Sequence, residues 1–155
     1  MSNATLQPGP LLKRLHAAFC HDATRHDLLQ MAADGIRDAG GPYTSVYLYL
    51  LDESGQTLNL GAFSGRVTEH TAIPIGRGLC GRAVATRQDL NVADVNAESE
   101  YLACNLDTRS ELIVLIRRNE EILGQIDIDS DVPDGFDANE QSAVKEVADG
   151  LASLL

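Results

Sequence analysis

The sequence predicts an α+β fold in which a central, mostly antiparallel sheet carries helices on one face. Two observations lead to this fold class. Apolar residues at helical spacing gather near the two ends of the chain, where they predict amphipathic helices. Between them, apolar runs come in pairs joined by short polar turns, which is the pattern of β-hairpins. Because hairpins build antiparallel sheets and the terminal helices cover one side, we expect a ligand pocket on the other side.

Four helices are expected from the positions of apolar residues, prolines and glycines. Pro8 and Pro10 open the first helix, and Gly40-Gly41-Pro42 ends the second. A short third helix follows a glycine-rich turn, and the last carries an apolar stripe from Val144 to Leu154. The apolar positions of these helices fall within residues 10–19, 28–36, 79–87 and 139–155.

Six strands are expected between these helices. They are dense in aliphatic and aromatic residues, and turn residues separate them, for example at 52–55 and 133–135. The polar stretch 94–107 is expected to be a loop with a short helix around 98–102. The strands are expected at residues 46–51, 57–63, 72–75, 90–92, 112–117 and 122–129.

The last hairpin has a register that can be argued from its side chains. Alternation along a strand puts apolar residues on one face and acidic residues on the other. Pairing Val114 with Ile126 keeps apolar residues opposite each other, and it requires a three-residue loop over 119–121. A two-residue turn would shift the pairing by one and set apolar against acidic residues. We therefore predict three carboxyl groups together on one face of the sheet, those of Glu111, Asp127 and Asp129.

This acidic cluster has two interpretations. A solvated sheet face is the simpler one. Three carboxyl groups within a few ångströms repel one another, however, so at least one of them should have a raised pKa. A protonated carboxyl group donates a hydrogen bond to an oxygen, while ionised neighbours accept from an ammonium group. The second interpretation is therefore a pocket for a small polar ligand.

The length and charge of the chain limit the classes of function. The 155 residues suffice for one domain with a core, so we expect a loose lead-in or cloning remnant over 1–9 and a single domain over 10–155. The formal net charge of −11 argues against nucleic acid as a partner, because phosphate binding requires a basic surface. No apolar run reaches the roughly 20 residues that span a bilayer, and no signal peptide is visible. We expect no membrane partner and a cytoplasmic location.

The three cysteines indicate reduced thiols and not a disulfide framework, because their number is odd. Cys80 and Cys104 lie 24 residues apart without a C-x-x-C motif, so their spacing predicts neither a zinc ribbon nor a thioredoxin site. By pattern alone they are either buried small side chains or reactive thiols. Cys20 is assigned to the buried kind. It follows His16 by four residues, but no second pair completes a metal site, so we predict no metal.

The segment from Gly76 to Gly81 matches the pattern G-x-G-x-x-G between a strand and a helix. A dinucleotide site would also need a parallel strand after the helix, with an acidic residue at its end, whereas this chain continues in hairpins. We interpret the segment as a tight turn whose backbone N–H groups, at a helix start, receive a small carboxylate. Gly78 is a candidate binding residue there.

Together these segments resemble GAF domains and, among them, the free methionine-R-sulfoxide reductases. The similarity extends from about Tyr43 to Leu155. It implies a GAF-type fold and an enzyme that reduces free L-methionine-(R)-sulfoxide. The resemblance is carried by residues 73–81 (IPIGRGLCG), 93–95 (ADV), 101–104 (YLAC), 110–111 (SE) and 124–130 (GQIDIDS).

The resemblance also implies roles for individual residues. The cysteine that matches Cys104 attacks the sulfoxide sulfur, and the one that matches Cys80 can resolve the sulfenic acid by forming a disulfide. Glu111, Asp127 and Asp129 match residues that line the pocket around the sulfoxide. The position of His70 commonly holds a further cysteine, so Cys80 is the only plausible resolver in this chain. The chain also lacks a tryptophan that the family usually places near the first strand.

The same resemblance implies no bound cofactor, a thioredoxin-like reductant, free methionine sulfoxide or another small ligand, and a homodimer. Two alternatives stay open. The chain could be a GAF sensor that binds a small ligand or responds to redox state without turnover. It could also be a dimerisation module that pairs through its apolar terminal helices.

Overall fold

The computed structural model describes residues 4–99, 101–102 and 106–155. Four α-helices, six strands and one 3-10 helix are found in these residues. Their order is α1 (Pro8–Cys20), α2 (Arg25–Arg37), β1 (Ser45–Leu51), β2 (Thr57–Ser64), β3 (Ala72–Pro74), α3 (Gly78–Thr86), β4 (Leu90–Val92), η1 (Val95–Ala97), β5 (Ser110–Arg118), β6 (Glu121–Ser130) and α4 (Ala138–Ala152).

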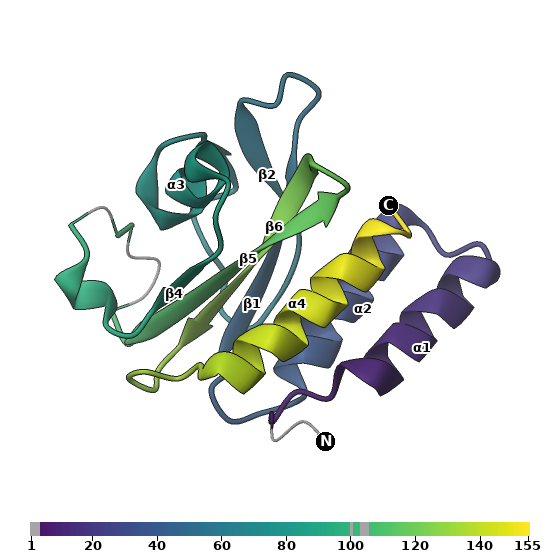
Figure 1. Ribbon diagram of the computed structural model, residues 1–155, viewed down its shortest axis with the longest axis horizontal. Helices are drawn as coiled ribbons and strands as arrows, with labels where there is room; N and C mark the ends of the chain where they lie inside the picture. Colours follow the sequence, from purple (N-terminus) through teal and green to yellow (C-terminus); the bar gives the residue numbers. More distant parts are fainter. Residues whose placement is uncertain (1–3, 100, 103–105) are drawn as a thin grey trace.

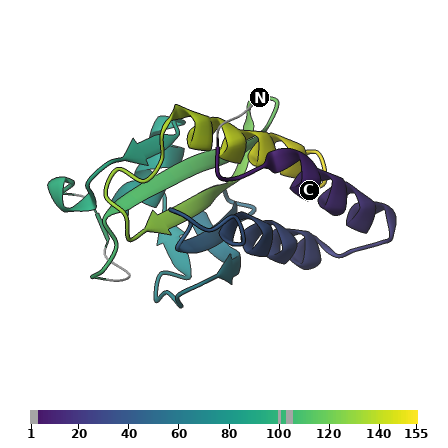
Figure 2. The same cartoon turned by 90° about the horizontal axis from the view of Figure 1, so that it is seen from below.

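The strands form one sheet in the order β3-β2-β1-β6-β5-β4, and every neighbouring pair is antiparallel. Helices α2 and α4 pack on one face of this sheet, and α1 lies across both of them (Figures 1 and 2). Helix α3 packs on the opposite face. The predicted α+β class with a mostly antiparallel sheet is confirmed, and the terminal helices do share one face. None of the described helices is long and apolar enough to cross a membrane.

Strand alternation divides the interior into two apolar clusters. On the helix-covered face, Val114 and Ile126 pack with residues of α1, α2 and α4. On the other face, Ile113 and Leu115 pack with α3 and with Tyr49 of β1. Neighbouring residues of β5 therefore serve different clusters, as a strand buried on both faces requires. This second face carries the predicted acidic residues.

Residues 4–7, which lie within the lead-in predicted over 1–9, pack against the domain. Ala4 and Leu6 are buried. The carboxylate of Glu140 accepts hydrogen bonds from the backbone N–H of Thr5 at 2.7 Å and of Leu6 at 3.2 Å. The hydroxyl of Tyr43 donates to the same carboxylate at 2.7 Å. Helix α4 therefore fixes these residues, and α1 begins at Pro8, one of the two prolines predicted to open it.

The predicted register of the last hairpin is confirmed, but its loop is different. Val114 pairs with Ile126 and Glu111 with Asp129. The connection is a two-residue turn, Asn119-Glu120, because Arg118 pairs with Glu121. An irregularity between Ile116 and Arg117 absorbs the one-residue shift that such a turn creates. Asn119 has a φ of +57°, a conformation that asparagine tolerates better than most residues.

One predicted element is misplaced. The 3-10 helix η1 covers Val95–Ala97, and the carboxylate of Asp94 caps it by accepting from the N–H of Asn96. Glu98 is extended, and neither Tyr101 nor Leu102 is helical. The helix expected around 98–102 is therefore wrong in position. A short Asx-type cap upstream satisfied the local backbone groups instead.

Candidate active site

A pocket lies between α3 and the face of the sheet that α1, α2 and α4 leave uncovered. The space between its walls, counted out into the open solvent at its mouth, is about 340 Å³. The expectation of a pocket on this face is confirmed. Its wall is formed by Tyr49, His70, Ile73, Arg77, Gly78, Leu79, Cys80, Tyr101, Leu102, Glu111, Asp127 and Asp129.

The glycine-rich turn forms one wall of the pocket. Gly78 begins α3 with a φ of +65°, a conformation that glycine adopts without strain. A Cβ on Gly81 would lie 2.6 Å from the carbonyl oxygen of Pro74, so this contact requires glycine as well. After α3 the chain enters β4, which is antiparallel to β5. The motif is therefore a tight turn and not a dinucleotide site, because that site needs a parallel strand at this point.

The three predicted carboxyl groups come together in the pocket. Glu111 projects from β5, and Asp127 and Asp129 project from β6. Their exposed fractions are only 4%, 5% and 5%. The cluster is therefore buried, and the alternative of a solvated sheet face is wrong. Helix α3 covers what would otherwise be the solvated face.

Burial of this cluster changes its protonation. Burial raises the pKa of Asp127, although hydrogen bonds from Glu111 and Cys80 act in the opposite direction. Burial also raises the pKa of Asp129 well above its ordinary value, and the charge of Asp127 raises it further. Two carboxyl groups that share a hydrogen bond need one proton between them. The cluster therefore retains protons at pH values where exposed carboxyl groups have lost them.

One oxygen of this cluster has no hydrogen-bond partner among the described residues. It is Oδ1 of Asp127, and the side chain that carries it lines the pocket. An unpaired buried acceptor costs roughly 1–3 kcal/mol. The site therefore keeps a hydrogen-bonding position that a ligand can fill.

Of the two thiols predicted for the site, Cys80 lies within the residues that the structure describes. It lies on α3, is buried, and its Sγ donates to Oδ2 of Asp127 at 3.3 Å. Burial raises the pKa of this thiol well above its ordinary value, and the charges of Asp127 and Glu111 raise it further. The thiol is therefore neutral near pH 7. The second predicted thiol, Cys104, lies outside the described residues.

Cys20 is exposed on α1, so its assignment to the buried kind was wrong. It is the last residue of α1, and the buried positions of this helix are Pro8, Leu11 and Leu15. His16 is exposed on the same helix, and its Nε2 lies 3.7 Å from the Cys20 sulfur.

Two tyrosines of β1 hold the loop that carries His70. The hydroxyl of Tyr49 donates to the carbonyl of His70 at 2.6 Å, and the hydroxyl of Tyr47 donates to the carbonyl of Arg66 at 2.7 Å. Sequence reasoning did not name Tyr49 as a wall residue, and it named His70 only as the position where the resemblance places a further cysteine. Alternation along β1 was a usable signal, since Tyr47 pairs directly with Asp127.

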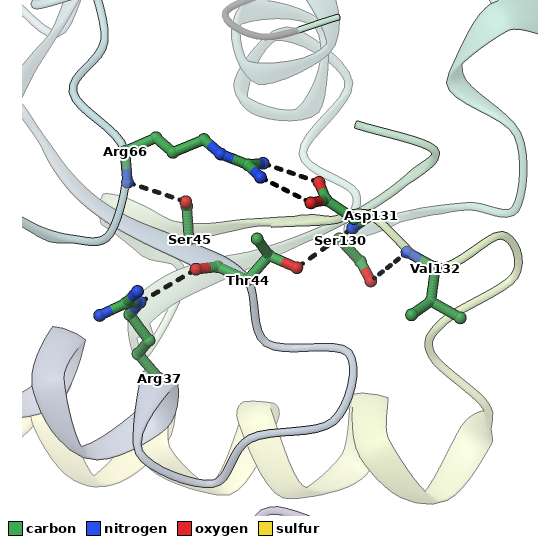
Figure 3. A network of polar contacts seen from close by, with 7 residues as sticks. All are labelled: Arg37, Thr44, Ser45, Arg66, Ser130, Asp131 and Val132. Carbon is green, nitrogen blue, oxygen red and sulfur yellow. Dashed lines mark hydrogen bonds and ion pairs between the residues drawn. The ribbon is translucent and has the colours of Figure 1, made fainter. Parts of the chain in front are cut away.

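A polar network fastens this loop to the end of β6 (Figure 3). The guanidinium of Arg66 makes two hydrogen bonds to the carboxylate of Asp131, at 2.7 and 2.6 Å. The backbone N–H of Arg66 donates to Oγ of Ser45, and that of Asp131 donates to Oγ1 of Thr44. The network thus joins the loop, the start of β1 and the end of β6 at one edge of the pocket.

The cluster also has the composition of a metal-binding set. The sulfur of Cys80 and carboxyl oxygens of Glu111 and Asp127 lie within 4.8 Å of one another. Hydrogen bonds among the same three groups account for this spacing without an ion. The structure therefore offers no reason to change the prediction of a metal-free site.

The chain is similar to several known proteins. A family model described as a GAF domain matches residues 22–155. The free methionine-R-sulfoxide reductase of Escherichia coli (strain K12) is 34% identical over 107 residues, which cover 69% of this chain and 63% of that protein. The chain spans 66%, 63% and 53% of the lengths of three curated relatives that it matches.

Two solved structures are similar over nearly the whole chain. The type II free methionine-R-sulfoxide reductase of Thermoplasma acidophilum is 32% identical with a TM-score of 0.77, covering 93% of this chain and 94% of that one. The free methionine-R-sulfoxide reductase of Neisseria meningitidis, solved in complex with its substrate, is 28% identical with a TM-score of 0.86. The second match covers 99% of this chain and 91% of that one.

Proposed function

The chain belongs to the GAF domain family, and we propose that it is an enzyme that reduces free L-methionine-(R)-sulfoxide to L-methionine. The observation that carries this proposal is the buried cluster of Glu111, Asp127 and Asp129 beside Cys80 in one pocket. The reductases to which the chain is similar give the proposal its substrate. A buried acid next to a thiol is suited to a reaction in which an oxygen takes up a proton.

The pocket offers a partner for each polar group of this substrate. A protonated carboxyl group of the cluster donates to the sulfoxide oxygen, and an ionised neighbour accepts from the substrate ammonium group. Gly78 lies in the wall where α3 begins, and the start of a helix favours an anion such as the substrate carboxylate. The buried unpaired oxygen of Asp127 gains a donor when the ammonium group binds.

The chemistry uses two thiols in turn. The Cys104 thiolate attacks the sulfoxide sulfur while the protonated carboxyl group of the cluster gives its proton to the sulfoxide oxygen. The resulting hydroxyl group passes to the cysteine sulfur, and methionine leaves with Cys104 as a sulfenic acid. The thiol of Cys80 then attacks the sulfenic sulfur, and a disulfide and one water molecule form. A dithiol reductant of the thioredoxin kind returns the disulfide to two thiols by exchange.

Asp127 is placed to assist the second step. Its Oδ2 already accepts the hydrogen bond of the Cys80 thiol, so it can take the proton as Cys80 attacks. This assistance matters because the raised pKa of Cys80, caused first by burial, leaves little thiolate at neutral pH. Binding of the substrate ammonium group offsets part of the negative charge in the pocket, which favours the Cys104 thiolate.

The proposed partners follow from this scheme. They are free methionine sulfoxide, a thioredoxin-like donor and a second copy of the chain, and the proposed location is the cytoplasm. The homodimer is proposed to form through the terminal helices, where Phe19 of α1 is 45% exposed. Light scattering measures the oligomeric state directly.

A coupled assay tests the proposed reaction. Free methionine sulfoxide as a mixture of sulfur epimers is supplied with thioredoxin, thioredoxin reductase and NADPH, and NADPH oxidation is followed. We expect turnover of one epimer by the wild type, none by Cys104→Ser and unchanged turnover by Cys20→Ser, which removes an exposed thiol on α1. Absence of turnover by the wild type would contradict the proposal.

A GAF sensor without turnover is the second candidate. The neutral, buried state of Cys80 is the observation that favours it, because a binding pocket does not need a reactive thiol. Calorimetry with methionine sulfoxide separates the two functions. A sensor binds the ligand without consuming it, whereas the enzyme releases methionine.

A further inference from the structure

The loop between β2 and β3 is held at several points although it forms no helix or strand. The backbone N–H of Arg66 donates to Ser45 at 3.0 Å, and its carbonyl accepts from Tyr47. At the other end of the loop, the carbonyl of His70 accepts from Tyr49, and its N–H donates to Thr68 at 3.0 Å. The loop therefore meets β1 at both ends, and His70 forms part of the pocket wall.

The side chain of Arg66 adds a further attachment. Its two hydrogen bonds to Asp131 form the fork geometry that arginine makes with carboxylates. Both side chains are 35% exposed, so solvent and salt screen the pair only in part. Asp131 follows the strand that carries Asp127 and Asp129, so the pair ties the loop to the acidic strand (Figure 3).

We propose that Arg66 is a positioning residue of the pocket: paired with Asp131, it holds the loop that carries His70 and keeps a positive charge at the end of the strand that carries Asp129, two residues beyond it. This inference rests on the proposed reductase function for its effect on turnover. Its structural part can be tested without turnover. No role for Arg66 in substrate contact is required, because it acts through the loop and through Asp129.

The charges around Asp129 give opposite roles to the two members of the pair. Asp127 stands on the same strand, Glu111 lies opposite on β5, and Cys80 approaches from α3. Burial and Asp127 raise the pKa of Asp129, and the nearby charge of Asp131 raises it further. Arg66 is the neighbouring group that lowers it. The charge of His70 lowers the pKa of Asp127. The charge of Asp107 raises the pKa of Arg66, and the charge of Arg109 lowers the pKa of Asp131.

Neutralising Arg66 and neutralising Asp131 should therefore shift the pKa of Asp129 in opposite directions. Arg66→Gln removes the cation, so Asp129 should titrate at higher pH. Asp131→Asn removes an anion and leaves the cation, so Asp129 should titrate at lower pH. Arg66→Lys retains the charge without the fork, so it should restore the titration toward the wild type. A pair with a structural role alone predicts the same direction for both neutral variants.

The experiment combines a titration with an assay. The carboxyl carbon of Asp129 is followed by ¹³C NMR as pH changes, with the signal assigned by its loss in Asp129→Asn. Steady-state kinetics of methionine sulfoxide reduction are measured on the same proteins. We expect opposite shifts of the titration in Arg66→Gln and Asp131→Asn. We also expect kcat/KM of Arg66→Gln to fall roughly tenfold, because a misplaced wall weakens substrate alignment.

Lys145→Gln is the matched control, since it removes one positive charge from α4, on the sheet face opposite the pocket, where Lys145 pairs with Asp149. It should change neither measurement.

Shifts in the same direction, or no shift, in the two neutral variants would overturn the charge role of Arg66. Unchanged kcat/KM in Arg66→Gln would overturn its positioning role. If Arg66→Gln fails to fold, Arg66→Lys and Asp131→Asn decide the question. A wild type without turnover contradicts the proposed function, while the NMR titration still tests the electrostatic inference.

Discussion

Two buried carboxyl groups of this protein have pKa values that are shifted in opposite directions. Glu140 on α4 is 6% exposed, and Asp129 on β6 is 5% exposed. Burial alone would raise the pKa of Glu140, but the N–H of Thr5, the hydroxyl of Tyr43 and the N–H of Leu6 outweigh it and hold that pKa below its ordinary value. For Asp129, burial and the charge of Asp127 prevail, and the pKa is raised. The balance between burial and hydrogen-bond donors therefore decides the charge state at each site.

The difference separates a structural role from a chemical one. Glu140 satisfies two backbone donors and a tyrosine, so it joins α4 to the lead-in and to the start of β1. Asp129 accepts no comparable hydrogen bonds within the described part of the chain, and the acidic cluster keeps protons that a ligand can accept. The first arrangement stabilises the fold, and the second stores a reactive group at a cost in stability.

Asp129→Asn should have the largest effect on function. If this carboxyl group supplies or shares the catalytic proton, kcat/KM should fall by about 100-fold or more, the usual contribution of a general acid. Stability near neutral pH should rise, because the variant has no carboxyl group to keep protonated in the buried site. Assay and denaturant unfolding measure the two effects. Loss of activity together with loss of stability would indicate a structural role instead.

Glu140→Ala should have the largest effect on stability. It leaves the N–H of Thr5, the N–H of Leu6 and the hydroxyl of Tyr43 without their acceptor, so we expect a loss of about 3 kcal/mol. Activity per folded molecule should remain that of the wild type. Urea unfolding gives the free energy, and activity is measured well below the transition. A change under 1 kcal/mol would show that water replaces the carboxylate readily.

Cys80→Ala should separate the two chemical steps. The first methionine should still form in a single turnover without reductant, since Cys104 performs that step. Steady-state turnover with thioredoxin should fall about tenfold, because the sulfenic acid then lacks its internal partner. Quenched single-turnover reactions and mass spectrometry of the oxidised wild type check this. Failure to find a Cys80–Cys104 disulfide in the wild type would refute the resolver role.

The dependence of stability on pH should show both carboxyl sites in one curve. The pKa of Glu140 is lowered because its hydrogen-bond donors outweigh the effect of burial. Glu140 therefore adds stability at pH values above its unfolded pKa of 4.5, and this stability is lost as pH falls through the folded pKa. The raised pKa values of Asp127 and Asp129, caused first by burial, act in reverse. The stability that these two groups contribute is fully present below their unfolded pKa of 3.8 and is lost as pH rises through the folded pKa.

Single variants should remove one limb of this curve each. Glu140→Gln should flatten the acidic limb, and Asp129→Asn should flatten the limb toward higher pH. Thermal unfolding at a series of pH values provides the curves. If both variants change the same limb, the two sites do not differ as described.

Much of the fold and the acidic cluster followed from local patterns. Alternation in the last two strands was sufficient to pair Val114 with Ile126 and to bring Glu111 beside Asp129. The turn was missed because an irregularity in the strand can absorb a one-residue shift, and the sequence does not mark that irregularity. Pattern reasoning thus succeeds where both strand faces are strongly specified.

Long-range contacts were harder to predict. The contact between Glu140 and Thr5 joins residues 135 positions apart, so no local pattern announces it. The loop of His70 is also held by a distant segment, since tyrosine hydroxyls of β1 donate to its carbonyl groups at the pocket. The prediction for Cys20 was wrong because an apolar stripe does not show how far along a helix the buried contacts extend. In α1 the buried positions end at Leu15, and Cys20 lies beyond them.

Infrared spectroscopy of the buried carboxyl groups tests the central claim most directly. A protonated carboxyl group has a carbonyl stretch that an ionised carboxylate lacks, so the difference between wild type and Asp129→Asn at pH 7 reports on this group. We predict a protonated-carboxyl band in the wild type that is lost in the variant and altered by methionine sulfoxide. Absence of the band in the ligand-free wild type would contradict a site that keeps a proton ready for its substrate.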